Sequence, residues 1–175
     1  MLLGCGAVAV GALWAGRVRA AEGPAAAMRW LELRNTHTSE VLSVAYRDAG
    51  QFVATALDRL QWLLRDHRAN ESHPIDAQLF DQLADLADVA GVQPRFEIIS
   101  GYRSPVTNSK LADASAGVAR RSLHMDGRAI DVRLQGVSCA RLRDLALTAG
   151  RGGVGYYHRS DFVHLDTGRV RSWAG

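Results

Sequence analysis

The sequence predicts a single α+β domain with a small, mainly antiparallel sheet and flanking helices. Pairs of short segments rich in β-branched and aromatic residues stand at both ends of the chain, each pair separated by a polar turn, as in β-hairpins. Between these pairs, apolar residues recur at helical spacing. Strands and helices that are segregated along the chain in this way are typical of α+β folds.

The first half of this domain is expected to contain two strands followed by two helices. Residues 28–33 and 41–46 are the predicted strands, and the polar segment 35–39 joins them. A helix is expected from about residue 52 to residue 67. A second helix follows Pro74, because its apolar residues share one face: Leu79, Leu83, Leu86 and Ala90.

The second half is expected to contain four strands, one helix and one long loop. Residues 95–100 and 128–134 are the first two strands, and the loop 102–125 between them is too long to lack a function in a compact domain. Ser138 can cap a helix that ends at Gly150. Residues 152–157 and 161–167 then form a closing hairpin.

Composition and charge exclude several classes of protein. With 175 residues, of which 47% are apolar and 22% charged, the chain has the composition of a globular protein and room for one domain. The formal net charge is only +3. Because the longest arginine run is the pair Arg120 and Arg121, the electrostatic footprint of a nucleic-acid binder is missing.

The amino terminus is interpreted as an export signal. Residues 1–20 combine an apolar stretch with a small-x-Ala cleavage pattern at Val18–Ala20, and the stretch is too short for a membrane span. The missing basic region predicts that the true start lies upstream, where a twin-arginine signal is one form that the basic residues can take. Residues 21–28 would be a short tether and 29–175 the mature domain. Two alternatives stay open: lipidation at Cys5, and a buried helix of the mature domain.

Cleavage of this signal would leave Cys139 as the single cysteine of the mature chain. No disulfide can then form within the chain, even in an oxidising compartment. We expect Cys139 to be a small buried residue.

Two segments carry the residues with chemical potential. His124 precedes Asp131 by seven positions, and Asp131 lies in a strand of apolar neighbours. Strand alternation would place His164 on one face with Phe162 and Asp166. Two histidines and one aspartate from adjacent strands can form a three-ligand zinc site with an open fourth position. By spacing alone, a hydrogen-bonded core histidine and a turn-capping aspartate explain the same residues.

Several ordered motifs resemble the YcbK-type branch of the M15 peptidases. They are Ser100–Ser104 (SGYRS), Ser122–Asp131 (SLHMDGRAID) and Gly152–Tyr157 (GGVGYY) continuing into Asp161–His164 (DFVH). The resemblance implies the fold of D-alanyl-D-alanine peptidases and of the hedgehog signalling domain. It also implies site residues: zinc ligands at His124, Asp131 and His164, a substrate-binding arginine at Arg103 and a catalytic carboxylate at Asp161.

The resemblance implies hydrolysis by a metal-activated water, with Asp161 as general base and then general acid. Many relatives have Glu-x-Trp-His where this chain has Asp161-Phe-Val-His164. The carboxylate is therefore one methylene shorter, which puts its reach toward the water in doubt. Asp126 and Asp166 are the rival carboxylates for this role.

The function implied is that of a zinc-dependent murein endopeptidase, which hydrolyses peptidoglycan stem peptides or cross-links. The expected location is the periplasm, and a monomer without nucleic-acid partners is expected. Two alternatives stay open: a noncatalytic zinc-containing or cell-wall-binding module, since fold alone does not establish an activity, and a D,D- or L,D-carboxypeptidase of the same family.

Overall fold

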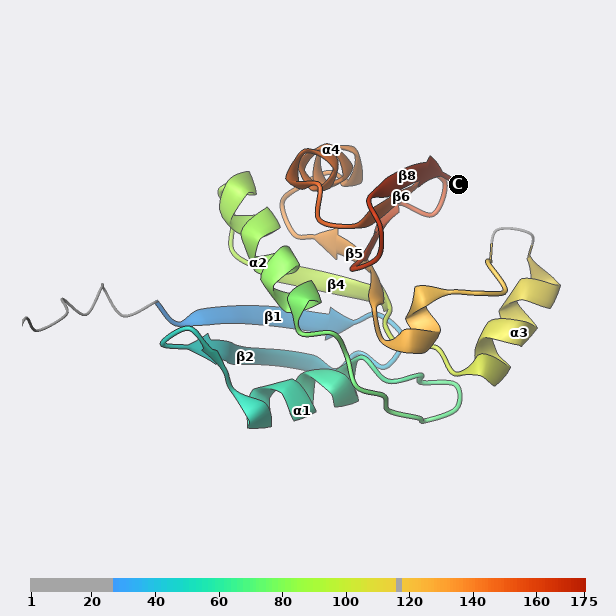
Figure 1. Ribbon diagram of the computed structural model, residues 1–175, viewed down its shortest axis with the longest axis horizontal. Helices are drawn as coiled ribbons and strands as arrows, with labels where there is room; N and C mark the ends of the chain where they lie inside the picture. Colours follow the sequence, from blue (N-terminus) through green and yellow to red (C-terminus); the bar gives the residue numbers. More distant parts are fainter. Residues whose placement is uncertain (1–26, 116–117) are drawn as a thin grey trace, which may run out of the picture.

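The computed structural model describes residues 27–115 and 118–175, and its framework there is an eight-stranded sheet (Figure 1). The order across the sheet is β3-β2-β1-β4-β5-β7-β6-β8. Five neighbouring pairs are antiparallel, whereas β1–β4 and β6–β8 are parallel, so the sheet is mixed. The strands are β1 (Arg29–Asn35), β2 (Val41–Asp48), β3 (Gln51–Phe52), β4 (Arg95–Ser100), β5 (Ala129–Leu134), β6 (Gly153–Tyr157), β7 (Phe162–Asp166) and β8 (Arg171–Ala174).

Four α-helices accompany the sheet in the described residues: α1 (Ala54–Leu63), α2 (Gln78–Ala90), α3 (Pro105–Ala114) and α4 (Cys139–Ala149). Serine side chains begin two of them, because Ser104 accepts a hydrogen bond from the Thr107 N–H and Ser138 accepts one from the Arg141 N–H. A 3₁₀-helix, η1 (Leu123–Asp126), lies between α3 and β5.

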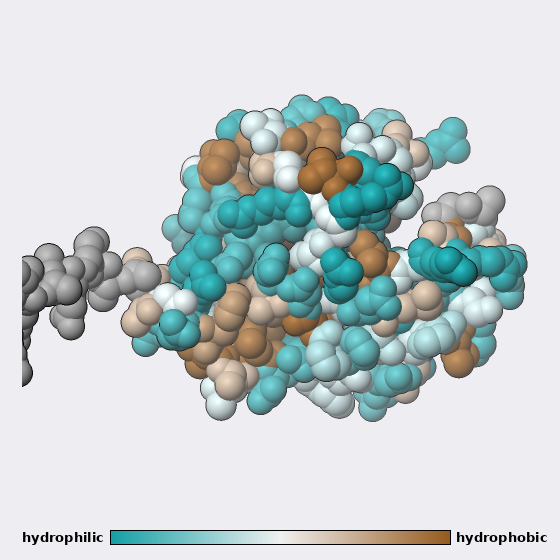
Figure 2. All heavy atoms as spheres, viewed as in Figure 1, coloured by the Kyte–Doolittle hydropathy of each residue, from teal (hydrophilic) through white to brown (hydrophobic). Residues whose placement is uncertain are grey.

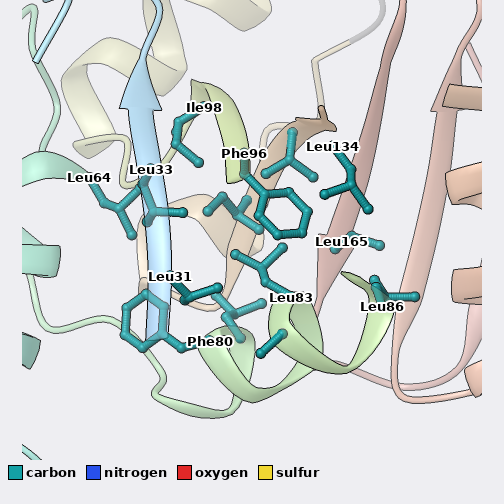
Figure 3. Packing of buried hydrophobic residues seen from close by; sticks show 14 of the residues in the cluster. Leu31, Leu33, Leu64, Phe80, Leu83, Leu86, Phe96, Ile98, Leu134 and Leu165 are labelled. Atoms are coloured by element: carbon teal, nitrogen blue, oxygen red, sulfur yellow. The ribbon is translucent and has the colours of Figure 1, made fainter. Parts of the chain in front are cut away.

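The hydrophobic core lies between one face of the sheet and the helices α1, α2 and α4. Apolar residues of α2 pack against alternate residues of β1, β4, β5 and β7 (Figure 3). Leu31 and Phe80 are fully buried in this layer. Because side chains alternate along a strand, the intervening residues point to the opposite face. That face carries charged residues of three neighbouring strands: Glu32, Glu97, Asp131 and Arg133.

The surface is mostly hydrophilic on the side shown in Figure 2, with a brown apolar patch over β2 and α1. No helix in the described ranges is both long enough and apolar enough to cross a membrane. The predicted signal, residues 1–20, lies outside the described residues, as does most of the predicted tether 21–28. Cys139 is buried, as predicted, and is a free thiol.

The predicted order of strands and helices is confirmed for both hairpins and for α1, α2 and α4, and three details are wrong. The predicted loop 102–125 contains α3 and η1. The chain adds β3 and a last strand, β8, so the sheet is larger than the small one expected. The first helix ends at Leu63 rather than near His67, because the chain turns there into an isolated bridge between Asp66 and Glu71.

Candidate metal centre

The structure brings His124, Asp131 and His164 together from η1, β5 and β7. Asp131 and His164 are direct partners in the β5–β7 register. Asp131 Oδ1 lies 3.3 Å from His124 Nε2 and 2.9 Å from His164 Nδ1. The two ring nitrogens are 3.2 Å apart. All three residues are buried, and this is the cluster of metal-binding side chains found in the described part of the chain.

Local sequence explains why His124 can approach the sheet. The Ser122 side chain accepts a hydrogen bond from the His124 N–H, which starts η1. Gly127 ends η1 in the left-handed region, with φ of 64°. A Cβ at this position would collide with the carbonyl oxygen of Pro74. Only glycine therefore allows the chain to turn tightly from His124 into β5.

Hydrogen bonds fix the orientation of both rings. His124 Nδ1–H donates to the Gly101 carbonyl oxygen at 2.7 Å, and His164 Nε2–H donates to Asp166 Oδ2 at 3.1 Å. Each ring therefore directs its other nitrogen at the Asp131 carboxylate. Such outer hydrogen bonds are typical of metal-ligating histidines.

With both rings neutral, the three converging nitrogen and oxygen atoms form a set of ligands that suits a cation. Ligand atoms about 2.0–2.1 Å from a tetrahedral zinc ion are roughly 3.3 Å apart. The separations of 2.9, 3.2 and 3.3 Å between the three atoms are close to this value. The two imidazoles and one carboxylate also match zinc's preference for nitrogen and oxygen donors. The residues present therefore fit a zinc ion.

The electrostatics of the cluster favour the metal-binding forms of His124 and Asp131, whereas the two carboxylates that flank His164 outweigh burial and raise the pKa of its ring, so a metal would displace a proton there. Burial lowers the pKa of His124 and so favours the neutral ring. Burial alone would raise the pKa of Asp131, but the charges and hydrogen bonds of His124 and His164 outweigh it and lower the pKa. A neutral imidazole and an ionised carboxylate are the metal-binding forms of these groups.

Asp166 supports the cluster from behind His164. Its side chain is fully buried and accepts two hydrogen bonds from Arg171, at 3.0 and 2.6 Å. The backbone N–H groups of Gly153 and Gly168 also donate to it. Burial would raise the pKa of Asp166, but these partners and His164 lower it. The carboxylate therefore stays ionised and is directed at the ring of His164.

Arg103 lies beside the cluster. Its guanidinium Nη2 is 4.0 Å from Asp131 Oδ2, and its side chain is only 12% exposed. Its Nε is buried and has no hydrogen-bond partner among the described residues. Burial lowers the pKa of Arg103, so an anionic partner in the cavity would be favourable.

The cluster opens into a cavity of about 340 Å³ with an aromatic wall. Tyr157 and Phe162 stack with ring centroids 4.5 Å apart, and the Trp173 indole N–H donates to the Tyr157 hydroxyl. Trp173 also lies 5.0 Å from the His164 ring. Trp173 was not among the site residues predicted from the sequence, because the four residues of β8 are too few to show a clear alternation. Further lining residues come from the segment before η1 and its first residue: Val118, Ala119, Arg121, Ser122 and Leu123.

Asp161, the predicted catalytic carboxylate, is not brought to this cavity. It lies in the turn before β7 with a side chain that is 69% exposed, and its carboxylate is 3.8 Å from Arg133 Nε. It lines a separate cavity of about 510 Å³ together with Arg133 and Cys139. Of the two rivals, Asp126 is exposed and Asp166 lies behind His164.

Comparisons with known proteins agree with this geometry. Residues 23–173 match the family model Peptidase M15_2, described as peptidoglycan L,D-endopeptidase MepK. The chain is 43% identical over 145 residues to peptidoglycan L,D-endopeptidase MepK of Escherichia coli strain K12, which covers 83% of this chain and 80% of the relative. It is 40% identical over 148 residues to the probable peptidoglycan L,D-endopeptidase MepK of Haemophilus influenzae, covering 84% and 80%. No solved structure gives a comparable match. The chain thus belongs to the MepK family of M15 peptidases.

Proposed function

We propose that this chain is a zinc-dependent peptidoglycan L,D-endopeptidase. The observation that carries the proposal is the convergence of His124 Nε2, Asp131 Oδ1 and His164 Nδ1 beside a buried arginine. Three protein ligands leave a fourth position open, which is the arrangement of catalytic zinc. Family membership and the names of both relatives support peptidoglycan as the substrate.

The residues around the cluster suit the hydrolysis of a peptide bond. Zinc, when bound, lowers the pKa of a water molecule toward 7 and polarises the scissile carbonyl. Arg103 supplies a planar guanidinium fork to the lining of the cavity, which can bind a substrate carboxylate or a developing oxyanion. The aromatic wall of Tyr157, Phe162 and Trp173 offers apolar surface to the rest of the peptide and restricts water on that side.

The assignment of proton transfer to Asp161 stays a prediction. Support comes from its place three residues before His164 in the motif that resembles the family. The exposed position beside Arg133 means that the β6–β7 turn would have to bring the carboxylate toward the cavity. Substitution of Asp161 decides this point.

We also propose export to the periplasm, with residues 1–20 as the signal, 21–28 as the tether and 29–175 as the catalytic domain of a monomer. Support comes from the sequence pattern of the signal and from the substrate named for both relatives. A fold like that of D-alanyl-D-alanine peptidases and the hedgehog domain is proposed from the same resemblance.

The experiment that tests the proposed activity uses purified sacculi. The zinc-loaded mature chain is incubated with sacculi, and the released muropeptides are identified by mass spectrometry. We expect cleavage inside the cross-linked peptides, as the name L,D-endopeptidase of both relatives indicates, and the masses of the products identify which cross-link is cut. Release of single terminal residues alone would favour a carboxypeptidase. Zinc binding without any hydrolysis would establish the noncatalytic module instead.

A further inference from the structure

A short segment, Gly101–Ser104, connects the metal cluster with the arginine beside it. The Gly101 carbonyl oxygen accepts the hydrogen bond from His124 Nδ1–H. Two residues later, the Arg103 N–H donates to the His124 carbonyl oxygen at 3.2 Å. The position of this segment therefore determines the orientation of the His124 ring. It also determines the position of the Arg103 backbone from which the guanidinium side chain extends.

The segment is itself held by the turn that follows α1. The Tyr102 N–H donates to the Leu64 carbonyl oxygen at 2.8 Å. A Cβ on Gly101 would lie only 2.5 Å from the same oxygen, so the two backbones are in close contact. Backbone contacts with Leu64 thus fix Gly101 and Tyr102, and Arg103 has a backbone hydrogen bond to His124 on one side. On its other side, Ser104 requires a further anchor.

Asp66 supplies that anchor. Its side chain is buried, and its Oδ2 accepts hydrogen bonds from the Ser104 N–H at 3.0 Å and from the Ser104 hydroxyl at 2.7 Å. Its Oδ1 accepts from the N–H groups of Arg68 and Ala69, at 3.0 and 3.3 Å. One carboxylate therefore ties the turn at residues 66–69 to the residue next to Arg103.

We propose that Asp66 is the positioning residue that holds Arg103 in the cavity for substrate binding; this role rests on the proposed function. Arg103 has few contacts of its own that could fix it. Its Nε has no partner among the described residues, and its nearest charged group is 4.0 Å away. Hydrogen bonds from Ser104 to Asp66 fix the path of the Arg103 backbone, and this path directs the Arg103 side chain toward the metal cluster.

The role requires a carboxylate and not merely a polar side chain. The four hydrogen bonds from Ser104, Arg68 and Ala69 all come from donors, and the Thr107 side chain also hydrogen-bonds to this carboxylate. An asparagine would direct its NH₂ group at one pair of these donors, so at least one buried backbone N–H would lose its acceptor. The pKa of Asp66 is lowered to about 2, because hydrogen bonds from Thr107, Ser104 and the backbone outweigh its burial.

The experiment compares Asp66→Asn with the parental chain, both loaded with zinc. The first readout is the NMR signal of the Arg103 Nε–H, which reports on the order of this side chain without any substrate. The second is kcat/KM on cross-linked muropeptides. We expect a displaced, broadened Arg103 signal and a kcat/KM lowered about tenfold, chiefly through KM. Zinc stoichiometry should be retained, because Gly101 is held by Leu64 and not by Asp66.

Asp81→Asn is the matched control for loss of stability. Asp81 is a partly buried carboxylate of α2 that accepts from the Tyr46 hydroxyl and from Arg29, away from the cavity. This control should lower the midpoint of unfolding and leave both readouts unchanged. If Asp66→Asn does not fold, Ser104→Ala removes one of the four bonds and should change both readouts in the same direction, by less.

A double variant tests whether Asp66 affects activity through Arg103. In an Arg103→Gln chain, Asp66→Asn should lower kcat/KM by less than about twofold, because the group that it positions is already gone. A full additive loss would overturn the proposal, as would an Arg103 signal unchanged by Asp66→Asn. Failure of the parental chain to hydrolyse muropeptides would refute the proposed function, and the NMR readout would still decide whether Asp66 orders Arg103.

Discussion

At the scale of single residues, His164 shows how one ring is held for metal binding from two sides. Asp131 lies 2.9 Å from its Nδ1, and Asp166 lies 3.1 Å from its Nε2. Burial alone would lower the pKa of His164, but these two carboxylates outweigh burial and raise it. In a zinc-bound state the metal replaces the proton on the Asp131 side. Asp166 then becomes the partner that keeps the ring in one orientation.

Replacement of His164 by alanine should abolish stoichiometric zinc binding and hydrolysis together. Two remaining ligands, His124 and Asp131, rarely hold zinc against solvent. Metal analysis of the purified variant measures this directly. His158→Ala is the control, because this exposed histidine lies in the β6–β7 turn outside the cavity. Full zinc occupancy in His164→Ala would show that the ligand assignment is wrong.

Asp161→Asn tests the predicted proton acceptor. If the resemblance assigns the role correctly, the variant should keep its zinc and its fold, and hydrolysis should fall by roughly 10²-fold or more. Initial rates on purified muropeptides give the answer, and Asp161→Glu tests whether the longer side chain of the related motif works better. A rate near the parental value would agree with the exposed position beside Arg133 and would remove Asp161 from the mechanism.

The positions of single side chains could be predicted from the sequence where the residues lie in a strand, because side chains alternate between its two faces. The alternation of β7 predicts that Phe162, His164 and Asp166 share a face, and the structure confirms it. The direction of Asp161 could not be derived in the same way. This residue has a φ of 50° in a turn, where strand alternation no longer applies.

At the scale of elements, the last strand completes the cavity. β8 pairs in parallel with β6, and the register aligns Trp173 with Gly155, which in turn pairs with His164. A Cβ at Gly155 would lie 2.5 Å from the indole ring. The absence of a side chain at Gly155 therefore leaves the space in which Trp173 lies beside His164.

Gly155→Ala should displace Trp173 and loosen β8. Forcing an extra carbon into a packed site typically costs about 1–3 kcal/mol. Thermal unfolding measures this loss, and near-ultraviolet circular dichroism reports the changed environment of the indole. In a Trp173→Ala chain the space is already vacant, so adding Gly155→Ala should lower the midpoint of unfolding much less. Equal losses in both backgrounds would contradict the proposed clash.

Two elements, α3 and β8, could not be predicted from the sequence, for physical reasons. Only Thr107 and Asn108 of α3 are buried, so α3 lacks the apolar stripe by which helices are detected in a sequence. Its capping residue Ser104 followed by Pro105 was the available signal. β8 has four residues, two of them exposed, which is too short for a convincing alternation.

At the scale of the whole molecule, one face of the sheet packs against the core and stabilises the fold, and the other face carries the candidate site. Its core face is covered by α1, α2 and α4, which bury apolar residues from both halves of the chain. Its opposite face carries the metal cluster, so substrate can approach without disturbing the core. The order of elements could be predicted from periodicity. The mixed pairing could not, because the parallel pairs β1–β4 and β6–β8 join strands that are not consecutive in the chain.

Removal of metal should lower the stability of the whole domain and not only its activity. The cluster is built into β5 and β7 in the middle of the sheet, so an ion bound there stabilises the folded state but not the unfolded chain. Without the ion, the buried carboxylate of Asp131 faces two ring nitrogens with no cation between them. We expect chelation to lower the midpoint of thermal unfolding by roughly 5 °C or more, since about 1 kcal/mol corresponds to some 2–4 °C in a domain of this size. Added zinc should restore the midpoint, whereas magnesium, which prefers oxygen ligands, should not. His164→Ala should unfold at one temperature with or without chelator. If the chelator removes the metal from the parental chain and the midpoint of unfolding stays unchanged, the cluster does not couple metal binding to folding.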